Sequence, residues 1–187
     1  MLCGGASRRM GRDKALIEVD GTALAVRVAD ALRAGGCHEV RAVGGDASAL
    51  EALGLEVVPD AHPGEGPLGG LATALAAAPP GAVLALAPCD LVAPDPAATA
   101  QLLGALAAAP PEVDAVVPVV DGRDEWTLSA WRVDPARAAA VAALLADGRR
   151  RLAAVAEVAQ VVRVHDVERG AVADADRPED LPAGTDR

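Results

Sequence analysis

Aromatic side chains are almost absent from this chain of 187 residues. It has two tryptophans and neither tyrosine nor phenylalanine, so no phenol can act as an acid or a base. Hydrophobic residues still make up 52% of the sequence, so alanine, valine and leucine must supply most of the core. A chain of this length suits one domain with a full core. We therefore expect one domain over residues 1–181 and a frayed tail over residues 182–187.

Positive charge is scarce as well. The formal net charge is -10, which argues against a nucleic acid or an anionic membrane as partner but leaves room for an anionic small molecule. Residues 1–14 lack the apolar stretch of a signal peptide. The apolar region over residues 68–87 is broken by glycines and prolines, so we do not expect it to span a membrane. A cytoplasmic protein is the expectation.

Cysteine motifs are also missing. Cys3, Cys37 and Cys89 are far apart and show no C-x-x-C spacing, which predicts neither a zinc site nor a disulfide framework. We expect all three to be small buried residues. The three histidines show no partner spacing that would indicate a catalytic pair.

Short apolar runs alternate with longer segments rich in alanine and leucine. This pattern predicts a three-layer, Rossmann-like α/β domain with a mostly parallel sheet covered on both faces. The expected strands cover residues 40–43, 55–58, 83–86, 115–120, 128–131 and 161–164. The expected helices cover residues 22–34, 47–53, 71–77, 96–108 and 135–146.

The loops that follow strands are the expected ligand sites, because such sheets bind ligands at the carboxyl ends of their strands. These loops cover residues 4–13, 59–70 and 88–95. Only three residues precede the first loop, and a segment of this length is short for a central strand. Either this segment is a weak sheet edge, or the natural chain starts earlier.

The loop after residue 3 combines glycines with positive charge. Adjacent glycines let the backbone turn tightly, and successive N–H groups in such a turn can bind an anion. Four cations follow within seven residues, and the last of them, Lys14, is the chain's one lysine among 17 basic residues. A compact ammonium suits a position between phosphates. Because Asp13 precedes Lys14 and Ala15 follows it, the loop is not a Walker A motif.

Two expected strands end in an aspartate. Asp90 closes the apolar run over residues 83–90 and could bind Mg²⁺ together with phosphate oxygens, or could cap the next turn. Asp60 follows the strand over residues 55–58. Its carboxylate could accept hydrogen bonds from guanine or from ribose hydroxyls, or could form an Asx-turn.

The glycine-rich stretch resembles the signature loop of the molybdenum cofactor guanylyltransferases, L-A-G-G-x-S-R-R-M-G-x-D-K, and departs from it only by Cys3. The resemblance extends to residues 66–71, 88–90, 121–123 and 174–181. It implies a nucleotidyltransferase that moves GMP from GTP to molybdopterin carrying molybdenum, with Mg²⁺ as cofactor and pyrophosphate as product. We also expect transient contact with enzymes that make or accept the cofactor.

The resemblance implies roles for individual residues. Asp90 would bind both Mg²⁺ and the nucleotide. The residues expected to act in catalysis are Lys14, Arg8 and Arg9. The residues expected to bind the nucleotide are Leu2, Cys3, Gly4, Gly5, Lys14, Asp60 and Asp90.

The second substrate is expected at other positions. The resemblance suggests that Arg150 or Arg151 meets the phosphate of the pterin, although these arginines could instead serve a helix C-terminus. Asp176 stands where the family often has asparagine, and it could be a second metal ligand or a helix N-cap. Trp126 and Trp131 could stack on a pterin or pack in the core.

Two other functions stay open. The Gly4-Gly5 pair favours the guanylyl branch over the related cytidylyltransferases, which usually carry L-A-A-G. However, Val43-Gly44-Gly45 stands where the family has an asparagine that reads the base, so CTP or a different phosphorylated acceptor is an alternative. The second alternative is a protein of another class, namely a non-catalytic module that binds a nucleotide or a cofactor.

Overall fold

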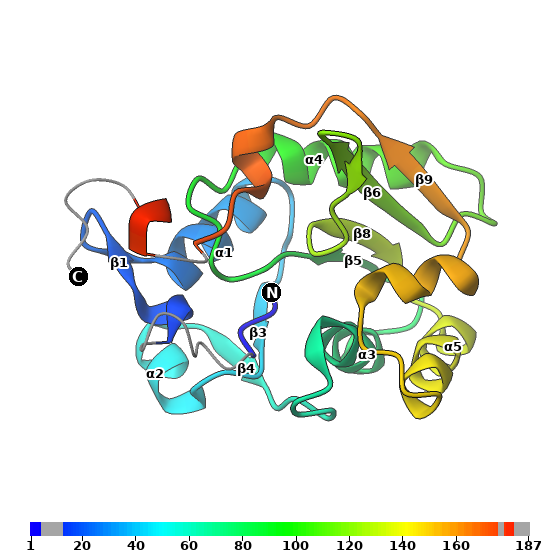
Figure 1. The fold of residues 1–187 in the computed structure, drawn as a ribbon, viewed down its shortest axis with the longest axis horizontal. Coiled ribbons are helices and arrows are strands. Elements are labelled where there is room, and N and C mark those ends of the chain that lie inside the picture. Colours follow the sequence, from blue (N-terminus) through cyan, green and yellow to red (C-terminus); the bar gives the residue numbers. More distant parts are fainter. Residues whose placement is uncertain (5–12, 176–177, 182–187) are drawn as a thin grey trace.

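The computed structural model describes residues 1–4, 13–175 and 178–181. Helices and strands alternate along this part of the chain, and Figure 1 shows how they are arranged. The α-helices are α1 (Leu24–Ala34), α2 (Ala47–Ala52), α3 (Gly66–Ala77), α4 (Pro96–Ala108) and α5 (Pro135–Ala146). The strands are β1 (Glu18–Val19), β2 (Thr22–Ala23), β3 (Arg41–Val43), β4 (Glu56–Val58), β5 (Val83–Leu86), β6 (Ala115–Val120), β7 (Arg123–Asp124), β8 (Ser129–Arg132) and β9 (Val161–Val164). Short 3-10 helices cover Lys14–Leu16, Leu152–Glu157, Arg169–Val172 and Pro178–Asp180.

Most of the expected elements are present. Helices α4 and α5 and strands β5, β6 and β9 have the predicted bounds, and several other elements differ by one residue at an end. Two expected helix starts are wrong. Helix α3 begins at Gly66 instead of Leu71, and α1 begins at Leu24 because the two residues before it form β2. The expected tail over residues 182–187 lies outside the described residues.

The segment over residues 1–3 lies inside the sheet. The N–H of Leu2 donates to Ala87 O at 2.8 Å on one side, and the N–H of Cys3 donates to Val43 O at 3.0 Å on the other. Leu2 forms parallel bridges with both Val43 and Pro88. The segment therefore joins the parallel pair β3–β4 to the end of β5, and it is not a sheet edge.

The remaining strands pair in mixed directions. Strand β8 runs antiparallel to both β5 and β6, whereas β9 is parallel to β6. The α/β class is confirmed, but a mostly parallel sheet is not. Two short antiparallel pairs, β1–β2 and β6–β7, were not expected from the sequence.

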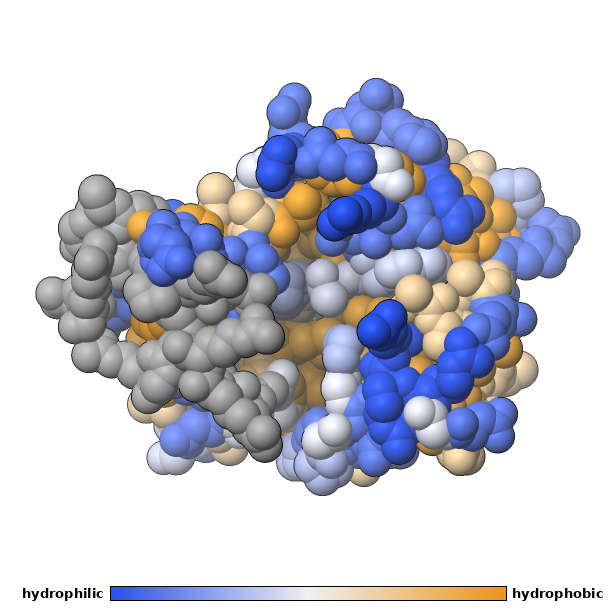
Figure 2. Space-filling view, in the orientation of Figure 1, coloured by the Kyte–Doolittle hydropathy of each residue, from blue (hydrophilic) through white to orange (hydrophobic). Residues whose placement is uncertain are grey.

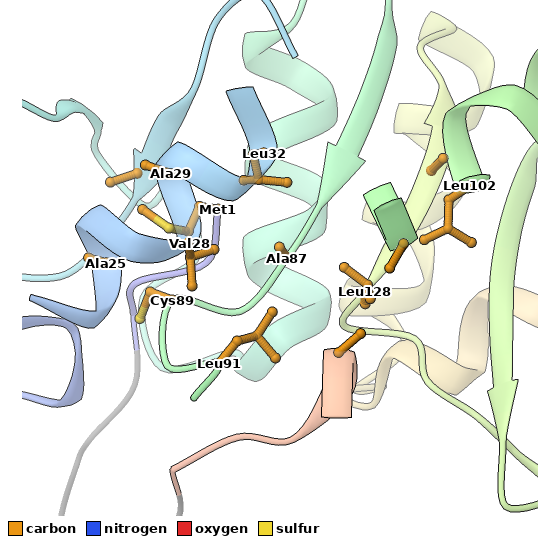
Figure 3. Close-up of a cluster of buried hydrophobic side chains, with 14 of the residues drawn as sticks. Met1, Ala25, Val28, Ala29, Leu32, Ala87, Cys89, Leu91, Leu102 and Leu128 are labelled. Atoms are coloured by element: carbon orange, nitrogen blue, oxygen red, sulfur yellow. The ribbon is translucent and has the colours of Figure 1, made fainter. Parts of the chain in front are cut away.

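Helices cover both faces of the sheet. Neighbouring residues of one strand face opposite sides, and Val116 lies in one buried cluster with α1 and α4, whereas Ala115 lies in another with α3 and α5. Figure 3 shows part of the first cluster, where Val28 and Leu32 of α1 gather near Met1. The arrangement is therefore three layers, helix–sheet–helix.

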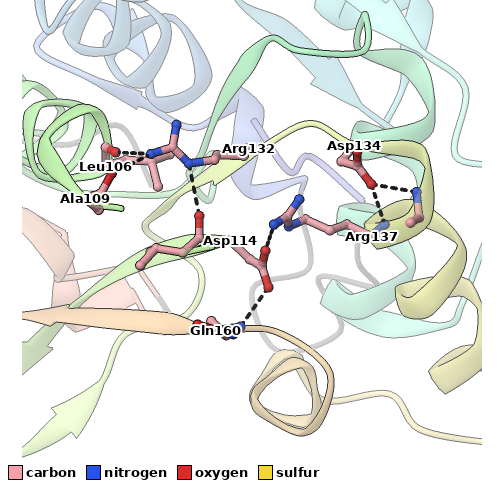
Figure 4. A network of polar contacts seen from close by, with 9 residues as sticks. Leu106, Ala109, Asp114, Arg132, Asp134, Arg137 and Gln160 are labelled. Atoms are coloured by element: carbon pink, nitrogen blue, oxygen red, sulfur yellow. Dashed lines mark hydrogen bonds and ion pairs between the residues drawn. The ribbon is translucent and has the colours of Figure 1, made fainter. Parts of the chain in front are cut away.

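A polar network ties the second half of the sheet to its helices (Figure 4). Arg132 of β8 donates from Nη2 to Leu106 O at 2.7 Å and Ala109 O at 3.0 Å, at the end of α4. Asp114 forms an ion pair with Arg137 of α5 and accepts a hydrogen bond from the N–H of Gln160. We call Asp114, Arg132, Arg137 and Gln160 the Arg132 network.

No described helix combines the length and the hydrophobicity that a bilayer-spanning segment needs.

Candidate functional site

A cavity of about 470 Å³ opens at the carboxyl ends of the central strands. Figure 2 shows this face of the molecule hollowed near its middle, close to the point where Figure 1 marks the N-terminus. The predicted site residues that line the cavity are Leu2, Cys3, Gly4, Lys14, Asp60 and Asp90. We call it the strand-end cavity.

A second cavity, of about 520 Å³, lies near the opposite ends of β3 and β5. Most of its lining is apolar, and two of its charged residues, Glu39 and Arg41, form an ion pair with each other at 3.1 Å. It contains none of the predicted site residues. The smaller strand-end cavity is therefore the candidate site, because it gathers acids and a lysine from separate segments.

Lys14 is held in place by the short helix that it begins. Asp13 caps this helix, since its carboxylate accepts a hydrogen bond from the N–H of Ala15 at 3.0 Å. Ala15 is fully buried in the same core cluster as α1. The turn is therefore anchored on its inner side, and the Lys14 side chain reaches into the strand-end cavity.

Lys14 and Asp90 meet across this cavity. The Nζ atom of Lys14 lies 3.0 Å from Oδ2 of Asp90, and their side chains are 18% and 14% exposed. Asp90 follows the buried pair Leu86 and Ala87, so the end of β5 fixes its position. The two residues are 76 positions apart in sequence, and the fold brings together the lysine and the acid that the sequence singled out.

Asp60 approaches the same cavity from the end of β4. Its Oδ1 atom accepts hydrogen bonds from the hydroxyl of Thr73 at 3.0 Å and from the N–H of His62 at 2.9 Å. A Cβ atom added at Gly4 would lie 3.7 Å from Oδ2 of Asp60, so the two residues are neighbours. Gly44 has a φ of +70°, and a Cβ added there would lie 3.3 Å from the Cα of Gly4, so glycine favours the close approach of these two strand ends.

The N-terminus of α3 also faces the strand-end cavity. Gly66 and Pro67, the first residues of the helix, line it together with Gly70. The first turn contains no acidic residue, and the acidic N-cap Glu65 forms an ion pair with Arg150. The sequence predicted a loop at these positions, so the helix N-terminus was not expected here.

Two free cysteines lie in the floor of the cavity. Cys3 and Cys89 are both buried, as expected, whereas Cys37 is only partly buried. A hydrogen bond with Cys3, together with burial, raises the pKa of the Cys89 thiol. Cys89 therefore stays protonated at neutral pH and is a poor nucleophile.

Neither of the arginines proposed for the second substrate lines the described part of the cavity. Arg150 forms an ion pair with Glu65 and donates to Leu145 O at 3.1 Å, so it links the end of α5 to the residue before α3. Arg151 is exposed. Arg150 thus stands beside the loop at Gly66, which also lines the cavity.

The C-terminal segment runs beside Asp90. Ala175 donates its N–H to the carbonyl oxygen of Asp90 at 2.9 Å, and Asp174 forms an antiparallel bridge with Leu91. Four predicted site residues lie outside the described part of the chain: Gly5, Arg8, Arg9 and Asp176.

The structure also places the two tryptophans. Trp131 is 1% exposed and packs in the core against α3 and α5, so it does not stack on a ligand. Trp126 packs against the same cluster. Sequence reasoning missed Thr127, which lines the cavity next to Trp126, and Thr73, which contacts Asp60 from inside α3.

The oxygen atoms of the cavity suit a hard cation. Among the described residues, no cluster of three or more histidine, cysteine or acidic side chains could hold a metal ion alone. Mg²⁺ commonly binds through one or two carboxylates together with substrate phosphates. Asp90 contributes one carboxylate to the lining of the cavity.

Comparison with known sequences gives a consistent result. A profile of the MobA-like NTP transferase domain matches residues 1–164. The chain is 36% identical to the molybdenum cofactor guanylyltransferase of Rhodobacter capsulatus over 194 residues, covering 100% of this chain and 94% of that protein. It is 43% identical over 95 residues to a probable molybdenum cofactor guanylyltransferase of Pelotomaculum thermopropionicum, covering 51% of this chain. That alignment and one with a Xanthomonas euvesicatoria relative span about half of those proteins, 43% and 52%.

Solved structures show the same fold. Molybdopterin-guanine dinucleotide biosynthesis protein A from Archaeoglobus fulgidus superposes with a TM-score of 0.75 at 23% identity, covering 96% of this chain and 92% of that chain. A protein of Mycobacterium tuberculosis solved as a manganese complex superposes with a TM-score of 0.63 at 20% identity, covering 96% and 92%. At such identities the likeness concerns the fold.

Proposed function

The chain belongs to the MobA-like NTP transferase family and is a nucleotidyltransferase, and we propose that it transfers GMP from GTP to molybdopterin, releasing pyrophosphate. The observation that carries this proposal is the contact between Lys14 and Asp90 in a cavity that also contains Asp60. A lysine, a candidate metal ligand and a candidate nucleoside ligand thus surround one space. The names of the aligned relatives support the choice of substrates.

Within this proposal, each residue has a separate task. Asp90 would hold Mg²⁺, which when bound offsets negative charge on the phosphates. Lys14 would bind the phosphates from the other side, and Asp60 would bind the nucleoside. The N-terminus of α3 adds N–H groups with a favourable dipole for an anion.

The reaction would be a direct displacement. An oxygen of the acceptor's terminal phosphate attacks the α-phosphorus of GTP, and the bond between that phosphorus and pyrophosphate breaks. The acceptor is a phosphate monoester and is already ionised at neutral pH, so no general base is needed. This agrees with the described lining of the cavity, where no histidine is found. Catalysis then rests on positioning and on stabilisation of charge.

The acceptor would approach from the side of Arg150 and Arg151. Arg150 already pairs with Glu65, so Arg151, which is exposed, is the more available cation for its phosphate. Asp176 would contact the second substrate, as the family resemblance implies. Arg8 and Arg9 would assist Lys14 on the leaving pyrophosphate. Because GTP is a cytoplasmic metabolite, we place the reaction in the cytoplasm.

A transfer assay tests this function. The protein is incubated with GTP, Mg²⁺ and molybdopterin, and both pyrophosphate and the guanine dinucleotide are measured. We expect both products in equal amounts, and formation of both slowed by ~10²–10³ with Asp90→Ala. Asp30→Ala is the matched control, because it removes an exposed carboxylate that pairs with Arg33 at 3.0 Å, away from the cavity lining.

The alternatives give different results in the same assay. Transfer from CTP but not from GTP would assign the chain to the cytidylyl branch. Binding of nucleotide without any product, under conditions where a known guanylyltransferase is active, would indicate a non-catalytic module and would refute the proposal.

A further inference from the structure

We propose that Thr73 is a positioning residue for nucleotide binding, which fixes the carboxylate of Asp60 so that only its Oδ2 atom is presented to the nucleoside. This inference rests on the proposed function, because it assumes that Asp60 contacts the nucleotide. It adds a residue that lies inside a helix and touches no ligand itself.

The position of Thr73 is unusual for a polar side chain. It lies in the middle of α3, among leucine, alanine and glycine, and is 4% exposed. A buried hydroxyl in a helix can satisfy itself by bonding to the carbonyl four residues earlier, and Thr73 Oγ1 does lie 3.0 Å from Gly69 O. It makes two more contacts, however, and both reach the loop that carries Asp60. These are the hydrogen bond to Asp60 Oδ1 at 3.0 Å and one from the N–H of Ala61 at 3.1 Å.

A hydroxyl has one proton, so Thr73 donates at any moment to either Asp60 or Gly69. The carboxylate is the stronger acceptor, because hydrogen bonds to an ionised group are roughly twice as strong as neutral ones. The Thr73 oxygen accepts the hydrogen bond from the N–H of Ala61 through a lone pair, so the hydroxyl proton remains available for Asp60. The three contacts together hold the end of β4 against α3.

The two oxygens of Asp60 are consequently in different surroundings. Oδ1 accepts from both Thr73 and the N–H of His62, which uses its two lone pairs. Oδ2 receives no hydrogen bond from the described residues and lies on the side of Gly4, where an added Cβ would be 3.7 Å away. Thr73, together with the N–H of His62, therefore holds the carboxylate in the orientation that turns one oxygen toward the strand-end cavity.

Loss of the Thr73 hydroxyl would leave Oδ1 of Asp60 accepting one hydrogen bond, from the N–H of His62. The carboxylate could then rotate about its last torsion, which is broad for aspartate. Ala61 would lose its acceptor as well. Small displacements of a binding group cost affinity even when the overall fold is retained.

The experiment compares three substitutions at buried or contacting positions. Thr73→Val keeps the shape and removes the hydroxyl, Thr73→Ser keeps the hydroxyl, and Asp60→Ala removes the carboxylate. Thr99→Val is the matched control, because Thr99 is also 4% exposed but lies in α4 against Gly35. Affinity for GTP with Mg²⁺ is measured by calorimetry, kcat and KM by the transfer assay, and Tm by thermal unfolding.

We expect Thr73→Val to raise the Kd and KM for GTP about tenfold, which corresponds to the loss of one hydrogen bond to a charged group. Its kcat should change much less. Thr73→Ser and Thr99→Val should stay within about twofold of the natural protein. In the Asp60→Ala background, Thr73→Val should cause no further loss of affinity, since Thr73 then has no carboxylate to hold.

Two results obtained with Thr73→Val would overturn the inference. The first is normal GTP affinity in the Thr73→Val protein. The second is a double variant whose loss of GTP affinity equals the product of the losses caused by Thr73→Val and Asp60→Ala separately. If Asp60→Ala itself leaves GTP affinity unchanged, the inference also fails, but the proposed function survives as long as Asp90→Ala slows transfer by ~10²–10³. Failure of the natural protein to transfer GMP would refute the proposed function instead.

Discussion

Polar side chains are used differently in the two halves of the sheet. In the half that contains residues 1–3 and the ends of β4 and β5, Lys14, Asp60 and Asp90 surround a cavity, and Oδ2 of Asp60 receives no hydrogen bond from the described residues. In the half formed by β6, β8 and β9, Arg132 donates to three backbone carbonyls, and Asp114 pairs with Arg137 and accepts from the N–H of Gln160. The first arrangement surrounds a cavity, whereas the second joins strands to helices.

We infer from this difference that the cavity residues serve ligand binding and that the Arg132 network serves the stability of the fold. Buried polar groups that are fully paired fix the packing of helices on strands, and their loss leaves partners without donors or acceptors. Groups around a cavity keep some contact with solvent, so the fold depends on them less. We therefore expect substitutions in the strand-end cavity to reduce activity, and substitutions in the Arg132 network to reduce stability.

The largest effect is expected for Lys14→Ala and Asp90→Ala. Each removes a charge proposed to act on the phosphates, so kcat should fall by ~10²–10³. Thermal unfolding should change little, because the pair is partly exposed. Arg163→Ala is the control: it breaks an exposed ion pair with Asp124 at 2.9 Å and should leave kcat unchanged. Near-normal turnover of either variant would remove that residue from the site.

The reverse pattern is expected for Arg132→Met. This substitution keeps an unbranched apolar stem but removes the donors to Leu106, Ala109 and Val113. The free energy of unfolding should fall by about 2–4 kcal/mol, measured by urea denaturation. Turnover per folded molecule should stay within about twofold of the natural protein. A large loss of turnover with unchanged stability would contradict the division between the two halves.

A smaller effect is expected at Gly45, which follows β3. Its φ is +85°, and an added Cβ would lie 2.9 Å from Leu50 Cδ1 and 3.0 Å from Cys3 O. Gly45→Ala should therefore lower the free energy of unfolding by about 1–3 kcal/mol. Because Cys3 lines the strand-end cavity, the Kd for nucleotide should rise too. Unchanged stability and affinity would show that this strand end is not tightly packed.

The smallest effect, and one of opposite sign, is expected at Gly104. This glycine lies in α4, is exposed, and has nothing within 4 Å of an added Cβ. Gly104→Ala should raise the free energy of unfolding by about 0.5–1 kcal/mol, because alanine favours helix more than glycine does. A loss of stability in urea denaturation would contradict the packing described for α4.

The sequence predicts elements well where local signals are strong. Helices α4 and α5 begin at a proline that follows an aspartate, and both were predicted with the observed bounds. The hairpin β1–β2 and the pair β6–β7 were missed, although each has an Asp-Gly turn with positive φ at Asp20-Gly21 and Asp121-Gly122. Their strands are too short to produce an alternating pattern.

The site was predictable in part for the same reason. The motif residues Lys14 and Asp90 could be named in advance, and the fold brings them into contact. Helix α3 was expected to begin later, because Gly66 and Pro67 read as loop residues, so its N-terminus was not assigned to the site. The hydrogen bond between Thr73 and Asp60 joins α3 to the end of β4, and no local sequence pattern predicts such a contact.

The central claim is that the strand-end cavity binds GTP together with Mg²⁺ through Asp90. Calorimetric titration of GTP, CTP and ATP into the protein, with and without Mg²⁺, tests it most directly. We predict binding of GTP in preference to the other two, dependent on Mg²⁺ and lost in Asp90→Ala. Equal binding of all three nucleotides, or GTP binding that persists in Asp90→Ala and without Mg²⁺, would contradict it.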